Sequence, residues 1–169
     1  LESGVTLTGD FTKTGPGSLY LKNFPVVNMD IAEGQVVFLW NEDNTFFSTQ
    51  SISGGGSVQF IGQAAGYFTF RAFQYSGALT YTGHTIVNLT PGGFDWWQGA
   101  LWLEKDDILP HATVVDLLSG KIYVREQTGN GLTVAGLTGN AGTYITTDHG
   151  VVQKWTLDVS NGVSCAYAG

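Results

Sequence analysis

Glycine interrupts this chain every few residues, and this spacing constrains the fold more than any other feature. The sequence contains 24 glycines in 169 residues, roughly twice the average share in proteins. The segments between the glycines are rich in Val, Ile, Thr, Phe, Tyr and Trp, which are the residue types that favour strands. No apolar period of 3.6 residues is present, so we predict an all-β protein with almost no helix.

Short strands are predicted along the whole chain, with turn signals about every 8–12 residues. The predicted strands are Leu19–Leu21, Val26–Ile31, Gln35–Trp40, Thr45–Gln50, Val58–Ile61, Tyr67–Gln74, Leu79–Tyr81, Thr85–Leu89, Leu101–Leu103, Thr113–Leu117, Lys121–Glu126, Leu132–Val134, Thr143–Thr147 and Val151–Val159. Ser164–Ala168 is short and is either an edge strand or a tail. Gln35–Trp40 is a continuous apolar run, so we expect both of its faces to be covered. The segment Ser53–Ser57 is predicted to be a glycine loop.

The order of strands and turns in residues 34–90 is matched by a similar order in residues 112–159. Gly54 and Gly56, for example, have counterparts in Gly129 and Gly131. Pro91-Gly92-Gly93 is the best boundary between the two stretches, because no strand could run through it. We therefore predict two similar β-units, one in residues 1–92 with an N-terminal arm and one in residues 93–169.

Many short strands with frequent turns favour antiparallel sandwiches. The stretch Gly62–Leu89 resembles the last two strands of immunoglobulin-like domains: a long alternating strand, a turn and a returning strand. The Cys–Trp–Cys hallmark of antibody domains is absent from the sequence. The predicted fold is an antiparallel β-sandwich made of two tandem immunoglobulin-like units, and the alternative is a single jelly roll.

Low charge limits the partners that this chain can have. Charged residues make up 12% of the sequence and the net charge is −7, with seven basic residues scattered singly. Without a cluster of Lys and Arg to neutralise phosphates, nucleic-acid binding is not expected. No apolar run is long enough to span a membrane. The single cysteine, Cys165, is expected to be a buried hydrophobic residue, with an interchain disulfide as the alternative.

The polar residues give no pattern that requires catalysis or a metal. Asn41–Asn44 and Glu104–Asp107 could supply part of a calcium site, but turns favour the same residues, and we prefer that interpretation. His84, His111 and His149 are far apart in sequence, and each lies beside a turn. No hydrolase, zinc-protease or nucleotide-binding motif is present. We therefore predict no enzyme activity, no catalytic residues, no metal and no cofactor.

Three tryptophans close together are the most suggestive chemistry in the sequence. Trp96 and Trp97 follow the glycine boundary, and Trp102 lies a few residues later. Neighbouring residues of an extended segment face opposite ways, so Trp96 and Trp97 cannot share one core. Exposed indole rings stack on sugars or on protein partners. We predict that these three residues contact a ligand or a partner, with packing in a core as the alternative.

Abundant Gly, Thr and Asn, as in the stretch Thr128–Asn140, make this chain similar to bacteriophage tail, fibre and head-decoration proteins. The resemblance rests on composition and carries over no functional residues. It implies a non-enzymatic structural protein of a virion or an extracellular surface. Such a protein forms a homo-oligomer, contacts other subunits of the same surface and contacts a host receptor. The alternative function is an extracellular carbohydrate-binding module that recognises a cell-surface glycan.

Overall fold

The computed structural model describes eleven segments of the chain. They are residues 9–21, 27–40, 47–48, 51–62, 74–75, 78–90, 99–103, 107–124, 131–147, 155–158 and 166–167. Within these segments the regular structure consists entirely of β-strands, as the sequence predicts. The predicted strand Tyr67–Gln74 lies almost wholly outside them.

The described strands lie on three sides of the molecule. One side is a seven-stranded sheet, the second is a five-stranded sheet, and the third side consists of two small sheets of three and two strands. The seven-stranded sheet has the order β17 (Ala166–Tyr167), β14 (Gly136–Gly139), β11 (Val114–Ser119), β9 (Thr85–Leu89), β7 (Ser57–Gly62), β4 (Gln35–Trp40) and β2 (Ser18–Leu21). The five-stranded sheet has the order β15 (Tyr144–Thr147), β12 (Lys121–Val124), β10 (Ala100–Leu103), β8 (Gln74–Tyr75) and β5 (Phe47–Ser48). The third side contains β1 (Phe11–Lys13), β3 (Met29–Ile31) and β6 (Ile52–Ser53), and farther along β13 (Leu132–Val134) and β16 (Trp155–Leu157).

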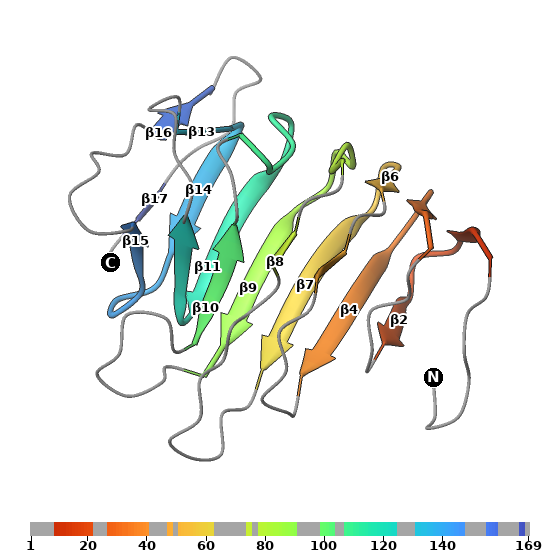
Figure 1. The fold of residues 1–169 in the computed structure, drawn as a ribbon, viewed down its shortest axis with the longest axis horizontal. Coiled ribbons are helices and arrows are strands. Elements are labelled where there is room, and N and C mark those ends of the chain that lie inside the picture. The colour runs from red at the N-terminus through yellow and green to blue at the C-terminus, as the bar shows by residue number, and fades with distance from the viewer. Residues whose placement is uncertain are drawn as a thin grey trace.

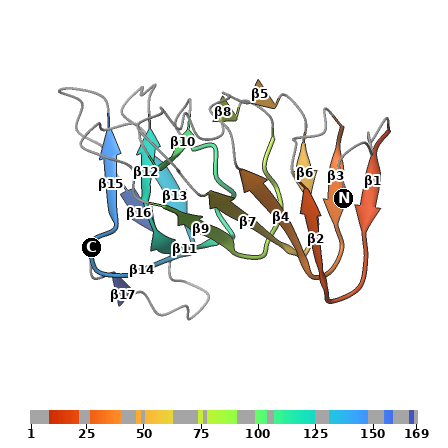
Figure 2. The ribbon, with the colours of Figure 1, turned by 90° about the horizontal axis from the view of Figure 1, so that it is seen from below.

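The chain winds as a solenoid, in which each turn, or rung, adds one strand to the seven-stranded sheet and at least one strand to the five-stranded sheet or the third side. The second complete rung, for example, runs from β6 on the third side through β7 of the seven-stranded sheet to β8 of the five-stranded sheet. The next rung stacks on it, since β9 pairs with β7 and β10 pairs with β8. Figures 1 and 2 show this progression as a colour sequence along the long axis, with β1 and β2 at one end and β15 and β17 at the other.

The predicted antiparallel sandwich is therefore wrong, because the described strands pair in parallel in all four sheets. Hairpins join antiparallel strands directly, whereas parallel neighbours require a long return connection. In this chain the return connection to the seven-stranded sheet is made by the strands of the other sides. The same finding excludes the jelly roll, which is built from antiparallel strands. The turn signals mark corners of a rung and not hairpins.

The predicted division into residues 1–92 and 93–169 stays a prediction. The seven-stranded sheet contains strands from both sides of it: β9 lies before Pro91, and its parallel neighbour β11 lies after Gly93. The hydrogen-bond ladder between these two strands links the two stretches. A repeat that is shorter than the predicted halves, namely the single rung, accounts for the regular order of strands and turns.

The core fills the inside of the solenoid with apolar side chains stacked in columns. One column contains Leu19, Val36, Val58, Thr85, Val115 and Leu137, and a second contains Leu21, Phe38, Phe60, Val87 and Leu117. In the second column the rings of Phe38 and Phe60 are stacked with centroids 5.7 Å apart. Val36, Val37 and Phe38 are all buried, so both faces of β4 are covered, as predicted.

A column of glycines occupies the corner between the third side and the seven-stranded sheet. Gly17, Gly34, Gly56 and Gly83 follow one another in successive rungs, and the backbone carbonyl of each earlier glycine accepts a hydrogen bond from the next rung. A Cβ atom on Gly34 would lie 2.4 Å from the carbonyl oxygen of Gly17, and one on Gly83 would lie 2.3 Å from that of Gly56. Close approach of the backbones therefore requires glycine at this corner.

A polar ladder stabilises another corner, just before the strands of the third side. The backbone and side-chain nitrogens of Asn28 donate to the carboxylate of Asp10, at 2.9 and 3.0 Å. The side-chain oxygen of Asn28 accepts hydrogen bonds from the backbone and hydroxyl of Ser51 in the next rung. Three successive rungs are thus joined by side chains as well as by the sheet.

Asp10 makes this corner sensitive to acid. The hydrogen bonds from Asn28, first from its side chain and then from its backbone, lower the pKa of Asp10 below its ordinary value of 3.8. The ionised carboxylate therefore contributes stability above about pH 4, and this contribution is lost as the pH falls through the folded-state pKa.

We expect the variant Asp10→Asn to show a smaller loss of stability than the native chain when the pH is lowered through this range. Urea unfolding of both proteins at several pH values between neutral and strongly acidic measures the difference. Identical pH profiles would contradict the role of Asp10.

Candidate functional site

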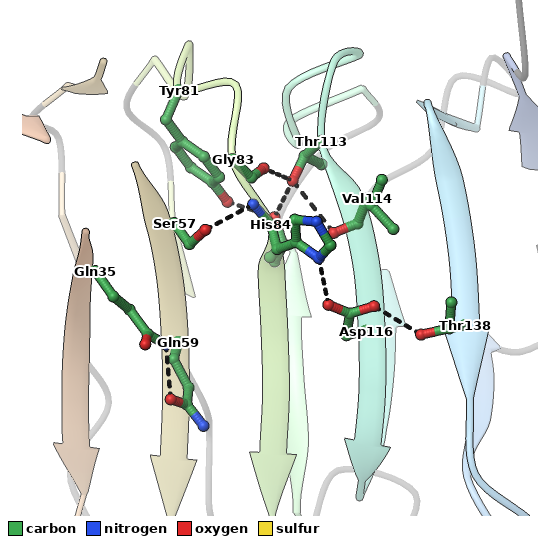
Figure 3. A network of polar contacts seen from close by, with 11 residues as sticks. Gln35, Ser57, Gln59, Tyr81, Gly83, His84, Thr113, Val114, Asp116 and Thr138 are labelled. Atoms are coloured by element: carbon green, nitrogen blue, oxygen red, sulfur yellow. Dashed lines mark hydrogen bonds and ion pairs between the residues drawn. The ribbon is translucent and has the colours of Figure 1, made fainter. Parts of the chain in front are cut away.

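The outer face of the seven-stranded sheet carries two groups of polar side chains that are hydrogen-bonded across neighbouring strands. Residues of its strands alternate between the core and this face. Two adjacent columns of the outward residues carry these polar groups, and a further outward column contains Leu39, Ile61 and Asn88. One of the two adjacent columns contains Ser18, Gln35, Ser57 and His84, and the second contains Tyr20, Val37, Gln59, Ile86, Asp116 and Thr138. Val37 is buried although it lies on this face, whereas the polar members of the two columns are at least partly exposed. We call these two columns the polar face. Figure 3 shows part of it, with Gln35, Ser57, Gln59, His84, Asp116 and Thr138.

A chain of hydrogen bonds crosses three strands of the polar face. His84 Nδ1 lies 2.5 Å from Asp116 Oδ2, and it is the donor because an ionised carboxylate can only accept. Thr138 Oγ1 donates to the other carboxylate oxygen of Asp116 at 2.7 Å. The side chain of His84 is 52% exposed and that of Asp116 is 20% exposed, so the imidazole is presented to solvent while the carboxylate orients it.

Two glutamines form a second polar pair on the same face. Gln35 Nε2 donates to Gln59 Oε1 at 2.7 Å, and Ser18 Oγ lies 3.5 Å from Gln35 Oε1. The contact joins the two columns diagonally, in the same sense as the contact from His84 to Asp116 (Figure 3). The amide nitrogen of Gln59 points away from Gln35 in this view.

Buried hydroxyl groups support the strand that carries His84. Thr85 faces the core, where its hydroxyl lies 2.5 Å from Tyr81 Oη and 2.9 Å from Thr113 Oγ1. Thr113 Oγ1 in turn lies 2.6 Å from the carbonyl oxygen of Gly83 and donates to it. The hydroxyls of Tyr81, Thr85 and Thr113 all have partners, so hydrogen bonds on the core side fix the position of the backbone beside His84.

Ser57, His84 and Asp116 are the residue types of a catalytic triad, but their geometry differs from one. In a triad the imidazole nitrogen that does not face the carboxylate bonds the serine hydroxyl. Here Ser57 Oγ accepts a hydrogen bond of 3.0 Å from the backbone N–H of His84. The three residues therefore form a chain that positions side chains on the polar face.

A second His–Asp pair lies at the corner before β11. His111 Nε2 is 2.6 Å from Asp107 Oδ2, and both side chains are more exposed than those of His84 and Asp116. Asp107 has a φ of 55° and accepts a hydrogen bond from the backbone N–H of Thr133 through Oδ1. The role of Asp107 is thus to connect this corner to the next rung, and His111 extends from it.

The predicted tryptophan site is described only in part. Trp96 and Trp97 lie outside the described residues. Trp102 in β10 is 6% exposed and packs edge-to-face against Tyr123 with ring centroids 4.8 Å apart. Together with Ala100 they form a small cluster separate from the main core. Contact of these tryptophans with a ligand or partner stays a prediction.

The structure describes some of the other polar candidates and leaves the rest outside the described segments. His84 and His111 each pair with an aspartate, whereas His149, the segment 41–44 and residues 104–106 lie outside the described part of the chain. In the described segments no group of three or more His, Cys, Asp and Glu is arranged to hold a metal ion.

Sequence reasoning did not find Gln35, Gln59, Asp116 and Thr138 as neighbours. They come from four different strands, and the bonded pairs are separated by 22 to 32 positions in the sequence. Only the parallel register places them side by side. An alignment of the chain by rungs, with the corner glycines as fixed points, would have placed Gln35, Ser57 and His84 in one column.

Comparisons with known proteins leave the fold and the polar face as the basis for assigning a function. Searches against protein-family models, curated proteins and solved structures find no match to this chain. Among the described residues, no helix is long and apolar enough to cross a membrane. The architecture defines a parallel β-solenoid.

Proposed function

We propose that the chain is a non-enzymatic structural protein of a virion or an extracellular surface, such as a capsid-decoration, tail or fibre component, and that it contacts a host receptor. The observation that carries this proposal is the parallel stacking of rungs along one axis. Each rung of a solenoid contacts only its neighbours, so such a protein forms a stiff element that extends in one direction. Low surface charge and abundant Gly, Thr and Asn agree with this role.

The ends of the solenoid supply a reason for assembly. Solenoids need their terminal rungs to be covered, because an open sheet edge offers unpaired backbone groups. In the described structure β2 and β17 are the outermost strands of the seven-stranded sheet. A homo-oligomer, or contact with other subunits of the same surface, would cover these ends. A net charge of −7 on 169 residues gives only moderate repulsion between copies.

We expect the purified chain to have the mass of a homo-oligomer in size-exclusion chromatography with light scattering. Small-angle X-ray scattering should give an elongated particle. A compact monomer at all concentrations would contradict the structural role.

The second candidate is an extracellular carbohydrate-binding module. The polar face favours it, because amide, imidazole, carboxylate and hydroxyl groups are the side chains that bind sugar hydroxyls through hydrogen bonds. A monomer that binds a glycan would support this function and exclude the structural one.

A further inference from the structure

We propose that the polar face is a binding site for a neutral, linear polysaccharide that lies across the strands, along the axis of the solenoid. The proposal deepens the receptor-contact part of the proposed function and rests on it. It assigns hydrogen bonding to Gln59 and His84, orientation of His84 to Asp116, and stacking to Tyr20.

The spacing of the polar groups along the solenoid axis fits the repeat of a linear sugar chain. Neighbouring strands of a sheet are about 4.7–4.9 Å apart, so each column repeats a side chain at this interval. One hexose unit of an extended polysaccharide has a similar length. A sugar chain along the solenoid axis would therefore meet one rung for each sugar unit, whereas a peptide strand added to a sheet binds at an edge and runs parallel to its strands.

Hydrogen bonds within the polar face fix the side chains of Gln59 and His84 before a ligand binds. Gln35 holds Gln59 at 2.7 Å, and Asp116 holds His84 at 2.5 Å while it is itself bonded to Thr138. Side chains that are already fixed lose little conformational entropy when a ligand binds. His84 remains 52% exposed in spite of its bond to Asp116, so the free side of its ring is available to solvent and to a ligand.

Charge and apolar area identify the class of polysaccharide. The carboxylate of Asp116 is already bonded to His84 and Thr138, and a chain of net charge −7 would repel a polyanion. A neutral polymer has no such penalty. The Tyr20 ring, 49% exposed at the N-terminal end of the polar face, offers a flat surface for the C–H face of a sugar, and the half-buried Ile86 lies farther along the same column.

The test is affinity gel electrophoresis of the full chain with soluble neutral linear glucans, mannans and galactans, and with a sulfated polysaccharide as the polyanion. We expect at least one neutral polymer to retard the native chain and the polyanion to leave it unretarded. Loss of one hydrogen bond in Gln59→Ala or His84→Ala should weaken binding about five-fold. Tyr20→Ala should weaken it by a similar factor.

His111→Ala is the matched control, because it removes an exposed imidazole that is also paired with an aspartate but lies at a corner. It should leave the affinity unchanged, and circular dichroism should confirm that every variant is folded. Retardation by none of the neutral polymers, retardation by the polyanion alone, or equal weakening by His84→Ala and His111→Ala would overturn the proposal. Since oligomeric mass is measured separately, a homo-oligomer without glycan binding would overturn only this inference.

Discussion

Replacement of Gly83 by alanine should destabilise the protein by about 3 kcal/mol, the upper part of the usual range for an overpacked site. The new Cβ atom would lie 2.3 Å from the carbonyl oxygen of Gly56 and 2.7 Å from Ser57 Oγ. The first of these is a backbone atom of the preceding rung, and it cannot move without disturbing the ladder between β7 and β9. Urea unfolding followed by circular dichroism measures the change in the free energy of unfolding.

Gly17→Ala is the control from the same corner column. No heavy atom lies within 4 Å of the position that its Cβ would take, because Gly17 belongs to the first rung. We therefore expect a change within about 0.5 kcal/mol, as for most exposed substitutions. If Gly83→Ala were as mild as Gly17→Ala, the close stacking of the corner would be wrong.

The second large effect concerns the alternation of faces in β11. Leu117 is fully buried in the second core column, next to Val87, whereas its neighbour Leu118 is 41% exposed. Leu117→Ala should cost about 2–5 kcal/mol, since it removes buried methyl groups and leaves a cavity. Leu118→Ala changes the same residue type one position later and should cost less than about 0.5 kcal/mol.

Thermal and urea unfolding of the two leucine variants can be compared directly. Equal losses of the free energy of unfolding would mean that both leucines are buried and that other residues cover this part of the outer sheet face. A larger loss for Leu118→Ala would invert the faces of the strand, because a shift by one residue moves every side chain to the other side.

The positions of many strands followed from the sequence. The predicted Gln35–Trp40, Thr85–Leu89 and Leu132–Val134 coincide with β4, β9 and β13. β-branched and aromatic residues between glycines define such segments locally, and the alternation in β7 and β9 defines which side chains are buried. The sequence does not predict β14, because Gly136–Gly139 contains two glycines and only one large apolar residue.

The direction of the neighbouring strands could not be derived in the same way. A period of two residues is the same in parallel and antiparallel sheets, so alternation contains no information on pairing. The glycine segment Ser53–Ser57 illustrates the ambiguity. Its residues predict a turn, and the chain does turn there, but it bends from β6 into β7 of the same rung and does not reverse into a hairpin.

The polar face shows the same division between local and tertiary information. The sequence predicts that His84 lies beside a turn, immediately before the strand Thr85–Leu89, and that Asp116 lies within the strand Thr113–Leu117. It did not determine that they are neighbours, since 32 positions separate them. Their contact depends on the length of the intervening rung and on the register of β11 against β9, both of which are fixed by the burial of core columns and by the corner glycines. Residue types and their local period thus determined the strands, while only the stacking of rungs decided which side chains meet.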